Sequence, residues 1–274
     1  MQIEKWLVQN ILTLQDAGIG TARLDALVLL EDLLDTDRAQ LLAHPEHELT
    51  DAQTAILQEQ IKRRARHVPL AYIRGKTEFY GRTFAVNDHV LEPRPETEMM
   101  IDLYKYLPGH DRMRVADIGT GSGALAITVK LDMPDTTLYG IDIDQHCLDL
   151  ARHNADRLKA DITLVKGDFA APLADLETPV DTLLCNLPYV PDNFQINTAA
   201  THEPRLAIFG GPDGLDTYRT LFGQLQGLQK SPRYVLTESL PPQHGELAEI
   251  AAAHGYGIQK REDFIQVFAL RAAA

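Results

Sequence analysis

The sequence has no long apolar run and little cysteine. A membrane-spanning helix needs about 18 or more consecutive apolar residues, and no segment of the 274 residues approaches that length. The only two cysteines, Cys147 and Cys185, do not have the spacing of metal ligands. The sequence therefore predicts no membrane span, no metal site and a reducing, cytoplasmic setting.

Positive charge is also scarce. The chain has 26 Lys and Arg residues against 39 Asp and Glu residues, which gives a net charge of -13. Because nucleic-acid affinity comes mainly from Lys and Arg on phosphates, this balance disfavours a nucleic-acid partner. The basic stretch Lys62–His67 is interpreted as the solvated end of a helix. Met1–Trp6 mixes an acid and a base, so no signal peptide is expected.

Residues 1–69 are predicted to form a small helical domain. Apolar residues recur at helical spacing from Trp6 to Leu14. The capping-box sequence Thr50–Gln53 opens a further helix, which Pro69 is expected to end. No cluster of catalytic residue types occurs here. We therefore expect this domain to pack on, or recognise, another molecule.

Residues 70–98 are predicted to connect this domain to the rest of the chain. Phe79–Val86 alternates around a glycine, as a β-hairpin does. Leu91–Glu98 contains two prolines, and Pro95 can open the next helix. The charged side chains of this segment are either solvated linker residues or substrate contacts.

Strands and helices alternate through the remainder, residues 99–274. Strands are expected at 114–118, 137–142, 162–165, 180–185 and 233–237, and helices at 123–130, 145–158, 218–228 and 243–254. A terminal hairpin is expected at 259–261 and 265–270. Such alternation predicts an α/β fold with a mostly parallel sheet covered by helices.

A glycine-rich turn follows the first of these strands. Gly119, Gly121 and Gly123 stand in the sequence Asp117-Ile118-Gly119-Thr120-Gly121-Ser122-Gly123. Glycines at this place let the backbone approach a ligand and present N–H groups to it. The spacing is not that of the Gly-x-Gly-x-x-Gly dinucleotide fingerprint. This difference disfavours an NAD-dependent dehydrogenase, as does the lack of a convincing set of hydride-transfer residues.

Acidic residues end the next two strands. Asp142 lies about 20 residues after the turn, where an acid binds ribose hydroxyls. Asp168, followed by Phe169, could accept a hydrogen bond from an adenine amino group. Together with the glycine turn, these acids predict a nucleoside-like cofactor at the carboxyl edge of the sheet.

The sequence Asn186-Leu187-Pro188-Tyr189 follows the strand at 180–185. It lies where ligands bind in open α/β sheets. The Asn186 side-chain oxygen and the Leu187 main-chain oxygen could accept the two N–H groups of a planar nitrogen. Such a grip would orient a poorly nucleophilic nitrogen, so catalysis would be mainly positioning.

The glycine turn and the two strand-end acids resemble the class I S-adenosylmethionine-dependent methyltransferases. The resemblance implies a Rossmann-like domain, with S-adenosylmethionine as cofactor and S-adenosylhomocysteine as product. It also places Asp117 near the methionine part. The candidate cofactor-binding residues are Asp117, Gly119, Thr120, Gly121, Gly123, Asp142, Asp168, Phe169 and Asn186.

Asn186–Tyr189 resembles the Asn-Pro-Pro-Tyr signature of methyltransferases that act on amide or amino nitrogens. The candidate catalytic residues are Asn186, Leu187, Pro188 and Tyr189. Tyr189 is expected to pack on the planar group. Leu187 departs from the signature, but leucine keeps the main-chain carbonyl and loses only the φ restriction of proline.

Further segments resemble the peptide chain release factor glutamine N5-methyltransferases. These are Pro93–Glu98, Glu203–Ala207 and Gly210–Asp216. Glu238 and Gln243 fit a later motif of that family, in which Leu240 replaces a glycine. The family also has a helical N-terminal domain and a hairpin connector.

This resemblance implies a substrate: the glutamine of the Gly-Gly-Gln tripeptide in a bacterial release factor. The helical domain would help to hold that protein, and a monomer is expected. The candidate substrate-binding residues are Asn186, Leu187, Pro188, Tyr189, Arg94 and Glu96.

Two alternatives remain. One is adenine-N6 methylation of nucleic acid, since similar motifs serve exocyclic amines; the other is a non-catalytic cofactor-binding module, suggested by Leu187.

Overall fold

The computed structural model describes residues 1–272, which divide into two compact units. One contains residues 1–76 together with 196–202, and the other contains residues 77–195 and 203 onward. Within the described residues, no helix has both the length and the apolar character needed to cross a membrane. The proposed boundaries at 69 and 98 remain predictions.

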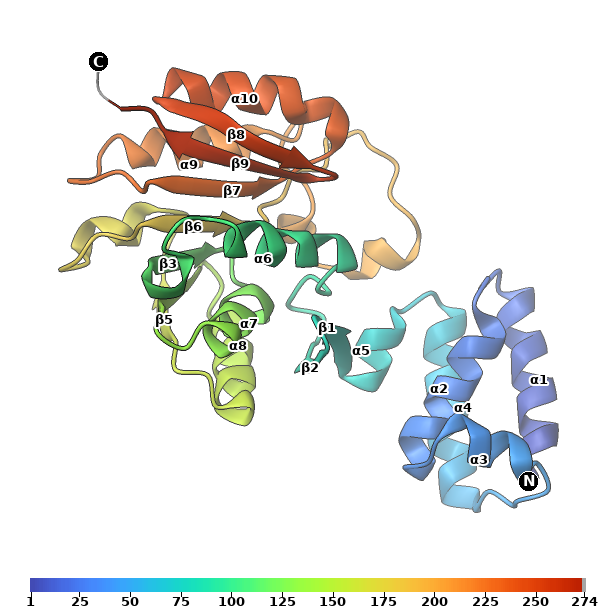
Figure 1. Ribbon diagram of the computed structural model, residues 1–274. Coiled ribbons are helices and arrows are strands. Elements are labelled where there is room, and N and C mark those ends of the chain that lie inside the picture. The colour runs from blue at the N-terminus through green and yellow to red at the C-terminus, as the bar shows by residue number, and fades with distance from the viewer. Residues whose placement is uncertain (273–274) are drawn as a thin grey trace. The chain divides into compact units, whose positions relative to one another are not determined.

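The first unit is helical (Figure 1). Its helices are α1 Ile3–Asp16, α2 Ala22–Leu34, α3 Arg38–Ala43, α4 Asp51–Ala65 and α5 Leu70–Arg74. Their core is built around Trp6, Leu14 and Leu57, all fully buried. The predicted capping box is present, since the side chains and backbones of Thr50 and Gln53 bond reciprocally.

The interpretation of Lys62–His67 as a solvated helix end is wrong for Arg64. Its guanidinium Nε lies 2.6 Å from Oδ2 of Asp25, and both side chains are largely buried. Because Asp25 lies on α2 and Arg64 on α4, this ion pair joins two helices of the unit. The helix α4 itself ends at Ala65, four residues before Pro69.

The second unit contains a hairpin and a seven-stranded sheet (Figure 1). The hairpin strands are β1 Lys76–Phe79 and β2 Arg82–Ala85. The sheet strands are β3 Arg114–Ile118, β4 Thr137–Asp142, β5 Thr163–Lys166, β6 Thr182–Cys185, β7 Tyr234–Glu238, β8 Tyr256–Glu262 and β9 Ile265–Leu270. The helices are α6 Glu98–Lys105, α7 Ala124–Asp132, α8 Gln145–Leu158, α9 Asp216–Leu225 and α10 His244–Ala253.

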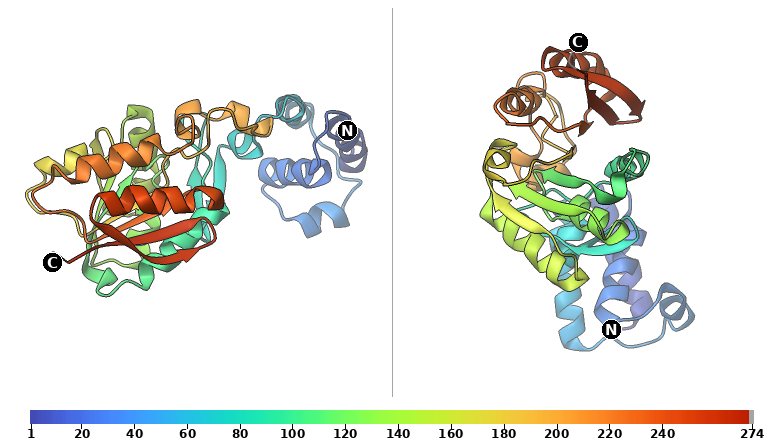
Figure 2. Two further views of the ribbon diagram at one scale, coloured as in Figure 1. Left: turned by 90° about the horizontal axis from the view of Figure 1, so that it is seen from above. Right: turned by 60° about the vertical axis from the view of Figure 1, so that its left-hand side comes forward.

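The strand order is β5-β4-β3-β6-β7-β9-β8. Strands β3 to β7 are parallel, and β9 and β8 form the antiparallel edge. Figure 2 shows this hairpin and α10 beside it from two further sides. The predicted α/β class with a terminal hairpin is confirmed. The strand β8 begins at Tyr256, earlier than predicted, and contains a register shift between Ile258 and Lys260.

Both faces of the sheet are covered, because its apolar strands alternate between two cores. Val115 and Leu184 face a cluster formed with α6, α7 and α8. Ala116 and Leu183 face the opposite cluster, formed with α9 and α10. The chain leaves β3 toward β4 and returns to β6 on its other side. This reversal is the switch point at which α/β sheets bind ligands.

Candidate active site

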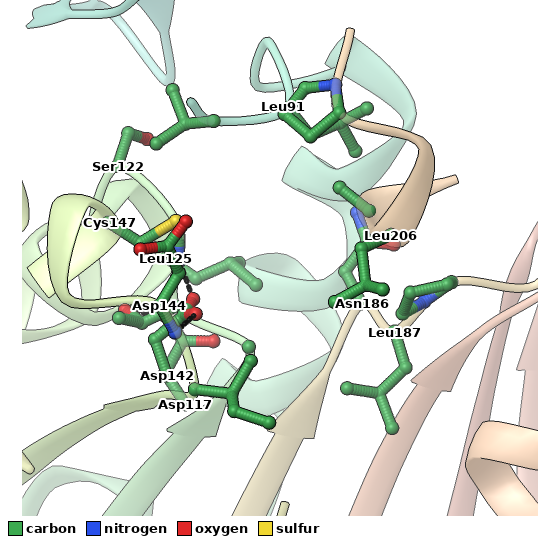
Figure 3. Close-up of a pocket in the computed structure, with 18 of the residues that line it drawn as sticks. Leu91, Asp117, Ser122, Leu125, Asp142, Asp144, Cys147, Asn186, Leu187 and Leu206 are labelled. Atoms are coloured by element: carbon green, nitrogen blue, oxygen red, sulfur yellow. Dashed lines mark hydrogen bonds between the residues drawn. The ribbon is translucent and has the colours of Figure 1, made fainter. Parts of the chain in front are cut away.

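A cavity of about 410 Å³ lies in the second unit, at the carboxyl ends of β3, β4, β5 and β6. In Figure 3, Asp117, Asp142 and Asp144 lie on one side and Asn186 and Leu187 on the other. The predicted residues that line it are Asp117, Gly119, Thr120, Gly121, Asp142, Asp168, Phe169, Asn186, Leu187 and Pro188. Gly123, Tyr189, Arg94 and Glu96 lie outside the lining.

Strand register brings the two predicted motifs together. Ile118 of β3 is paired with Cys185 of β6, so Gly119 and Asn186 leave the sheet side by side. Gly119 has a φ of +72°, and a Cβ there would lie 3.3 Å from Cδ2 of Leu187. The glycine therefore permits both the turn and the close approach of the second motif.

Gly123 serves packing. Its φ is +81°, and a Cβ would lie 2.9 Å from Cδ1 of Ile127 and 3.2 Å from Cβ of Ala151. This glycine therefore lets α7 begin close against α8. A cofactor contact by Gly123 remains a prediction.

The Asp117 carboxyl lies beneath the turn and is buried. Its Oδ2 accepts hydrogen bonds from the Thr120 hydroxyl at 2.7 Å and from the Ala126 N–H at 3.2 Å. Burial raises the pKa of Asp117 to about 7, although both donors lower it. Among residues 1–272, no cation forms an ion pair with this carboxyl. A positively charged ligand group in the cavity would stabilise its ionised form.

Asp142 organises the turn from the end of β4. Its Oδ2 accepts the Gly121 N–H at 2.9 Å, and its Oδ1 accepts the Asp144 N–H at 3.0 Å. Burial raises its pKa above the usual value for aspartate. Asp168 and Phe169 line the cavity after β5, and Phe169 has a positive φ of 45°. Three successive strand ends thus contribute to one cavity.

Asn186 and Leu187 carry the two acceptors expected from the sequence. The Asn186 Nδ2 donates to the Thr97 hydroxyl at 2.9 Å, which leaves the side-chain oxygen available. Among residues 1–272, no protein donor bonds to that oxygen or to the Leu187 carbonyl. The Leu187 side chain is buried in the core cluster around α9 and α10. Packing therefore restrains this position, where the resembled signature has proline.

The rest of the motif is fixed by hydrogen bonds. The Pro188 carbonyl accepts from the Thr217 hydroxyl at 2.8 Å, and the Tyr189 carbonyl accepts from Nε2 of Gln243 at 2.8 Å. The Tyr189 hydroxyl donates to Oε1 of Glu238 at 3.0 Å. Burial raises the pKa of Glu238 to about 7. Thr97 and Tyr189 lower this pKa, because each acts as a hydrogen-bond donor to the carboxyl. Packing of Tyr189 on a substrate remains a prediction.

Arg94 pairs with a buried carboxyl. Its Nη2 lies 2.5 Å from Oε2 of Glu203, whose side chain is only 2% exposed. Burial raises the pKa of Glu203 to about 7, while Arg94 lowers it. Glu96 is exposed. The ion pair joins the segments Pro93–Glu98 and Glu203–Ala207. A substrate contact by Arg94 or Glu96 remains a prediction.

Other lining residues carry no recognisable sequence signal. Phe79, His89 and Leu91 come from the connector, and Cys147 comes from α8. The His89 ring stacks on His146 with centroids 4.4 Å apart. The Cys147 thiol donates to the His89 carbonyl at 3.4 Å, and burial raises the pKa of that thiol to about 12. The connector thus supplies one wall of the cavity.

Comparison with known proteins agrees with this architecture. Residues 5–75 match the PrmC N-terminal domain, and residues 99–203 match the methyltransferase small domain. A methyltransferase from Pyrococcus furiosus has a similar fold, with a TM-score of 0.52 at 17% identity over 82% of this chain and 100% of that one. The T. thermophilus 16S rRNA methyltransferase RsmC, solved with AdoMet and guanosine, has a TM-score of 0.51 at 17% identity over 72% of this chain and 50% of that one.

The fold, the cavity at the switch point and the matched domain define a methyltransferase. A release factor glutamine methyltransferase from Moorella thermoacetica is 36% identical over 93% of this chain and 91% of its own. The corresponding protein of Bacillus anthracis is 35% identical over 77% of each chain. The chain belongs to the release factor glutamine methyltransferase family.

Proposed function

We propose that this protein transfers a methyl group from S-adenosylmethionine to the side-chain amide nitrogen of the glutamine in the Gly-Gly-Gln sequence of a bacterial release factor. The observation that carries the proposal is the pair of unpaired acceptors on Asn186 and Leu187 beside the cavity. The named relatives support the choice of substrate.

The cavity fits S-adenosylmethionine in its chemistry. Asp142 and Asp168 supply acceptors for ribose and adenine groups. Asp117 supplies a buried carboxyl that has no cation partner among residues 1–272, and it suits the ammonium group of the methionine part. Gly119, Thr120 and Gly121 bring the backbone close to these acids. We assign these residues, with Phe169, to cofactor binding, while Gly123 supports them from outside the lining.

Asn186 and Leu187 would hold the substrate amide. Each acceptor can take one N–H of a primary amide, so the nitrogen would be fixed in both position and plane. When bound, S-adenosylmethionine would supply an electrophilic methyl group on sulfur. A C–N bond would form as the C–S bond breaks, and one amide proton would be released to solvent. No strong base is needed before transfer, so the protein's contribution is chiefly orientation.

The three predicted domains take different roles in this proposal. Residues 1–69 would recognise the release factor, residues 70–98 would connect the domains, and residues 99–274 would form the methyltransferase domain. The net charge of -13 disfavours a nucleic-acid substrate. We expect a monomer in the bacterial cytoplasm, where release factors act.

Transfer from radiolabelled S-adenosylmethionine to a purified release factor tests the proposal. A release factor with the tripeptide glutamine changed to alanine is the matched control. We expect label only in the unmodified factor. Equal labelling of both factors would contradict glutamine as the acceptor. Label incorporated into RNA or DNA, and released by nuclease, would favour the nucleic-acid alternative. Cofactor binding without transfer to either factor would favour a non-catalytic module.

A further inference from the structure

We propose that Thr97 is a positioning residue: its hydroxyl, held between Asn186 and Glu238, determines which end of the Asn186 amide faces the cavity. This inference rests on the proposed glutamine methylation and concerns how the same site is kept in its working orientation. Thr97 lines the cavity and is 4% exposed.

The direction of the Asn186 amide decides what the site can bind. The two ends of the amide have similar shape, but one is an acceptor and the other a double donor. With Nδ2 bonded to the Thr97 oxygen at 2.9 Å, the acceptor end is left for the substrate N–H. A reversed amide would present donors to the donors of the substrate amide. Something in the structure must therefore disfavour the reversal.

In its ionised form, which prevails above its pKa of about 7, Glu238 provides that bias, because a carboxylate only accepts hydrogen bonds. It is 1% exposed, and within residues 1–272 its Oε2 meets no donor at ordinary hydrogen-bond geometry. The Thr97 hydroxyl faces this carboxyl and lowers its pKa as a donor does. A hydroxyl has one proton. When Thr97 directs that proton to Glu238, its oxygen can only accept from Asn186.

Topology places Glu238 where it can do this. It ends β7, and its neighbour Thr237 is paired with Cys185, the residue before Asn186. The Tyr189 hydroxyl donates to Oε1 of Glu238 and thereby fixes the rotamer of the carboxyl. Asn186 and Tyr189, the two ends of the motif, are thus both tied to one carboxylate, the first through Thr97 and the second directly.

The substitution pair Thr97→Val and Thr97→Ser isolates the hydroxyl. Valine keeps the shape but removes the oxygen, while serine keeps the oxygen. We expect Thr97→Val to lower kcat about tenfold, the worth of one positioning hydrogen bond. The dissociation constant of S-adenosylhomocysteine should stay within about twofold of that of the unmodified protein, as expected for a contact that does not touch the cofactor. Thr97→Ser should recover most of the lost kcat.

Two results would overturn the inference. One is an unchanged kcat in Thr97→Val; the other is a parallel loss of cofactor affinity that serine does not recover, which would indicate a structural role. Should the valine variant not fold, Glu238→Gln carries the test. Its amide can donate to Thr97 and so removes the fixed direction. We expect a similar fall in kcat, and an unchanged kcat would again contradict the inference.

A readout independent of turnover separates this inference from the proposed function. Absence of methyl transfer by the unmodified protein would refute the function alone. The Asn186 side-chain amide resonances of isotope-labelled protein then report its hydrogen bond directly. We expect Thr97→Val to shift them and to speed their exchange with water, and Thr97→Ser to preserve them. Resonances that are identical in all three proteins would overturn the positioning role.

Discussion

The side-chain amide of Asn186 donates a 2.9 Å hydrogen bond to the hydroxyl of Thr97, which lies 89 residues earlier in the chain. Thr97 ends a short 3-10 helix, Pro95–Thr97, in the segment that precedes the sheet. Asn186 directly follows β6 at the switch point. The bond therefore ties the segment Pro93–Glu98 to the carboxyl edge of the sheet, where the cavity lies.

Replacing Asn186 with alanine should separate catalysis from cofactor binding. The change removes one of the two proposed amide acceptors, and we expect kcat to fall roughly 100-fold or more because catalysis here depends on orientation. The affinity for S-adenosylhomocysteine, measured by calorimetry, should change little. A large loss of that affinity would mean that Asn186 chiefly holds the cofactor.

The role of Arg94 can be tested by a double-mutant cycle with Glu203. Arg94→Met leaves a buried carboxyl without its partner. We expect the free energy of unfolding to fall by roughly 1–3 kcal/mol. The loss should be smaller than for a fully buried pair, because Arg94 is partly exposed. Adding Glu203→Gln should restore much of it. If Arg94 instead binds substrate, KM for the release factor will remain raised in the double variant.

Two glycine substitutions should have opposite effects on stability. Gly123→Ala adds a methyl group at a φ of +81° and 2.9 Å from Ile127. We expect it to cost about 2 kcal/mol or more, through strain and overpacking. Gly223→Ala is the control: it lies in α9 with open space around it, and we expect a gain of about 0.5–1 kcal/mol. Denaturant unfolding measures both, and equal effects would contradict the packing role of Gly123.

Stability should depend on pH through several buried carboxyls. Burial raises the pKa of Asp117, Glu203 and Glu238 to about 7. The folded state thus binds more protons than the unfolded chain between about pH 4 and about pH 7, so the free energy of unfolding should fall as the pH rises across that range.

Asp117→Asn isolates one of these groups. With Asp117→Asn, the free energy of unfolding should decrease less steeply with rising pH, by at most about 1.4 kcal/mol per pH unit, because one titrating proton is removed. Asparagine keeps an acceptor for Thr120 and Ala126, so the local hydrogen bonds can persist. Urea unfolding across the pH range checks this. An identical slope in the variant would show that Asp117 does not titrate in this window.

The sequence predicts the fold well because its signals are local. Each parallel strand is a short apolar run, and glycines or acids mark where β3 and β4 end. Since parallel strands share one carboxyl edge, Asp142, Asp168 and Asn186 could be expected near one another. The start of β8 was less predictable, because Tyr256 is buried by pairing and packing that no local pattern records.

The supporting contacts depend on tertiary structure and could not be predicted. Thr97 lies in the segment Pro93–Glu98, which resembles the family, but only the fold brings its hydroxyl against Asn186 and Glu238. Arg64 belongs to a basic run, yet its partner Asp25 lies on another helix. In both cases a polar side chain meets a partner far away in the sequence, and a single sequence does not specify that pairing.

The central claim is that the protein methylates the tripeptide glutamine of a release factor, and that Asn186 holds the amide that receives the methyl group. Tandem mass spectrometry of a release factor incubated with the protein and S-adenosylmethionine tests it most directly. We predict one added methyl group on the side-chain nitrogen of the tripeptide glutamine, and none in a parallel incubation with Asn186→Ala. A methyl group on any other residue, or equal modification by the variant, would contradict the claim.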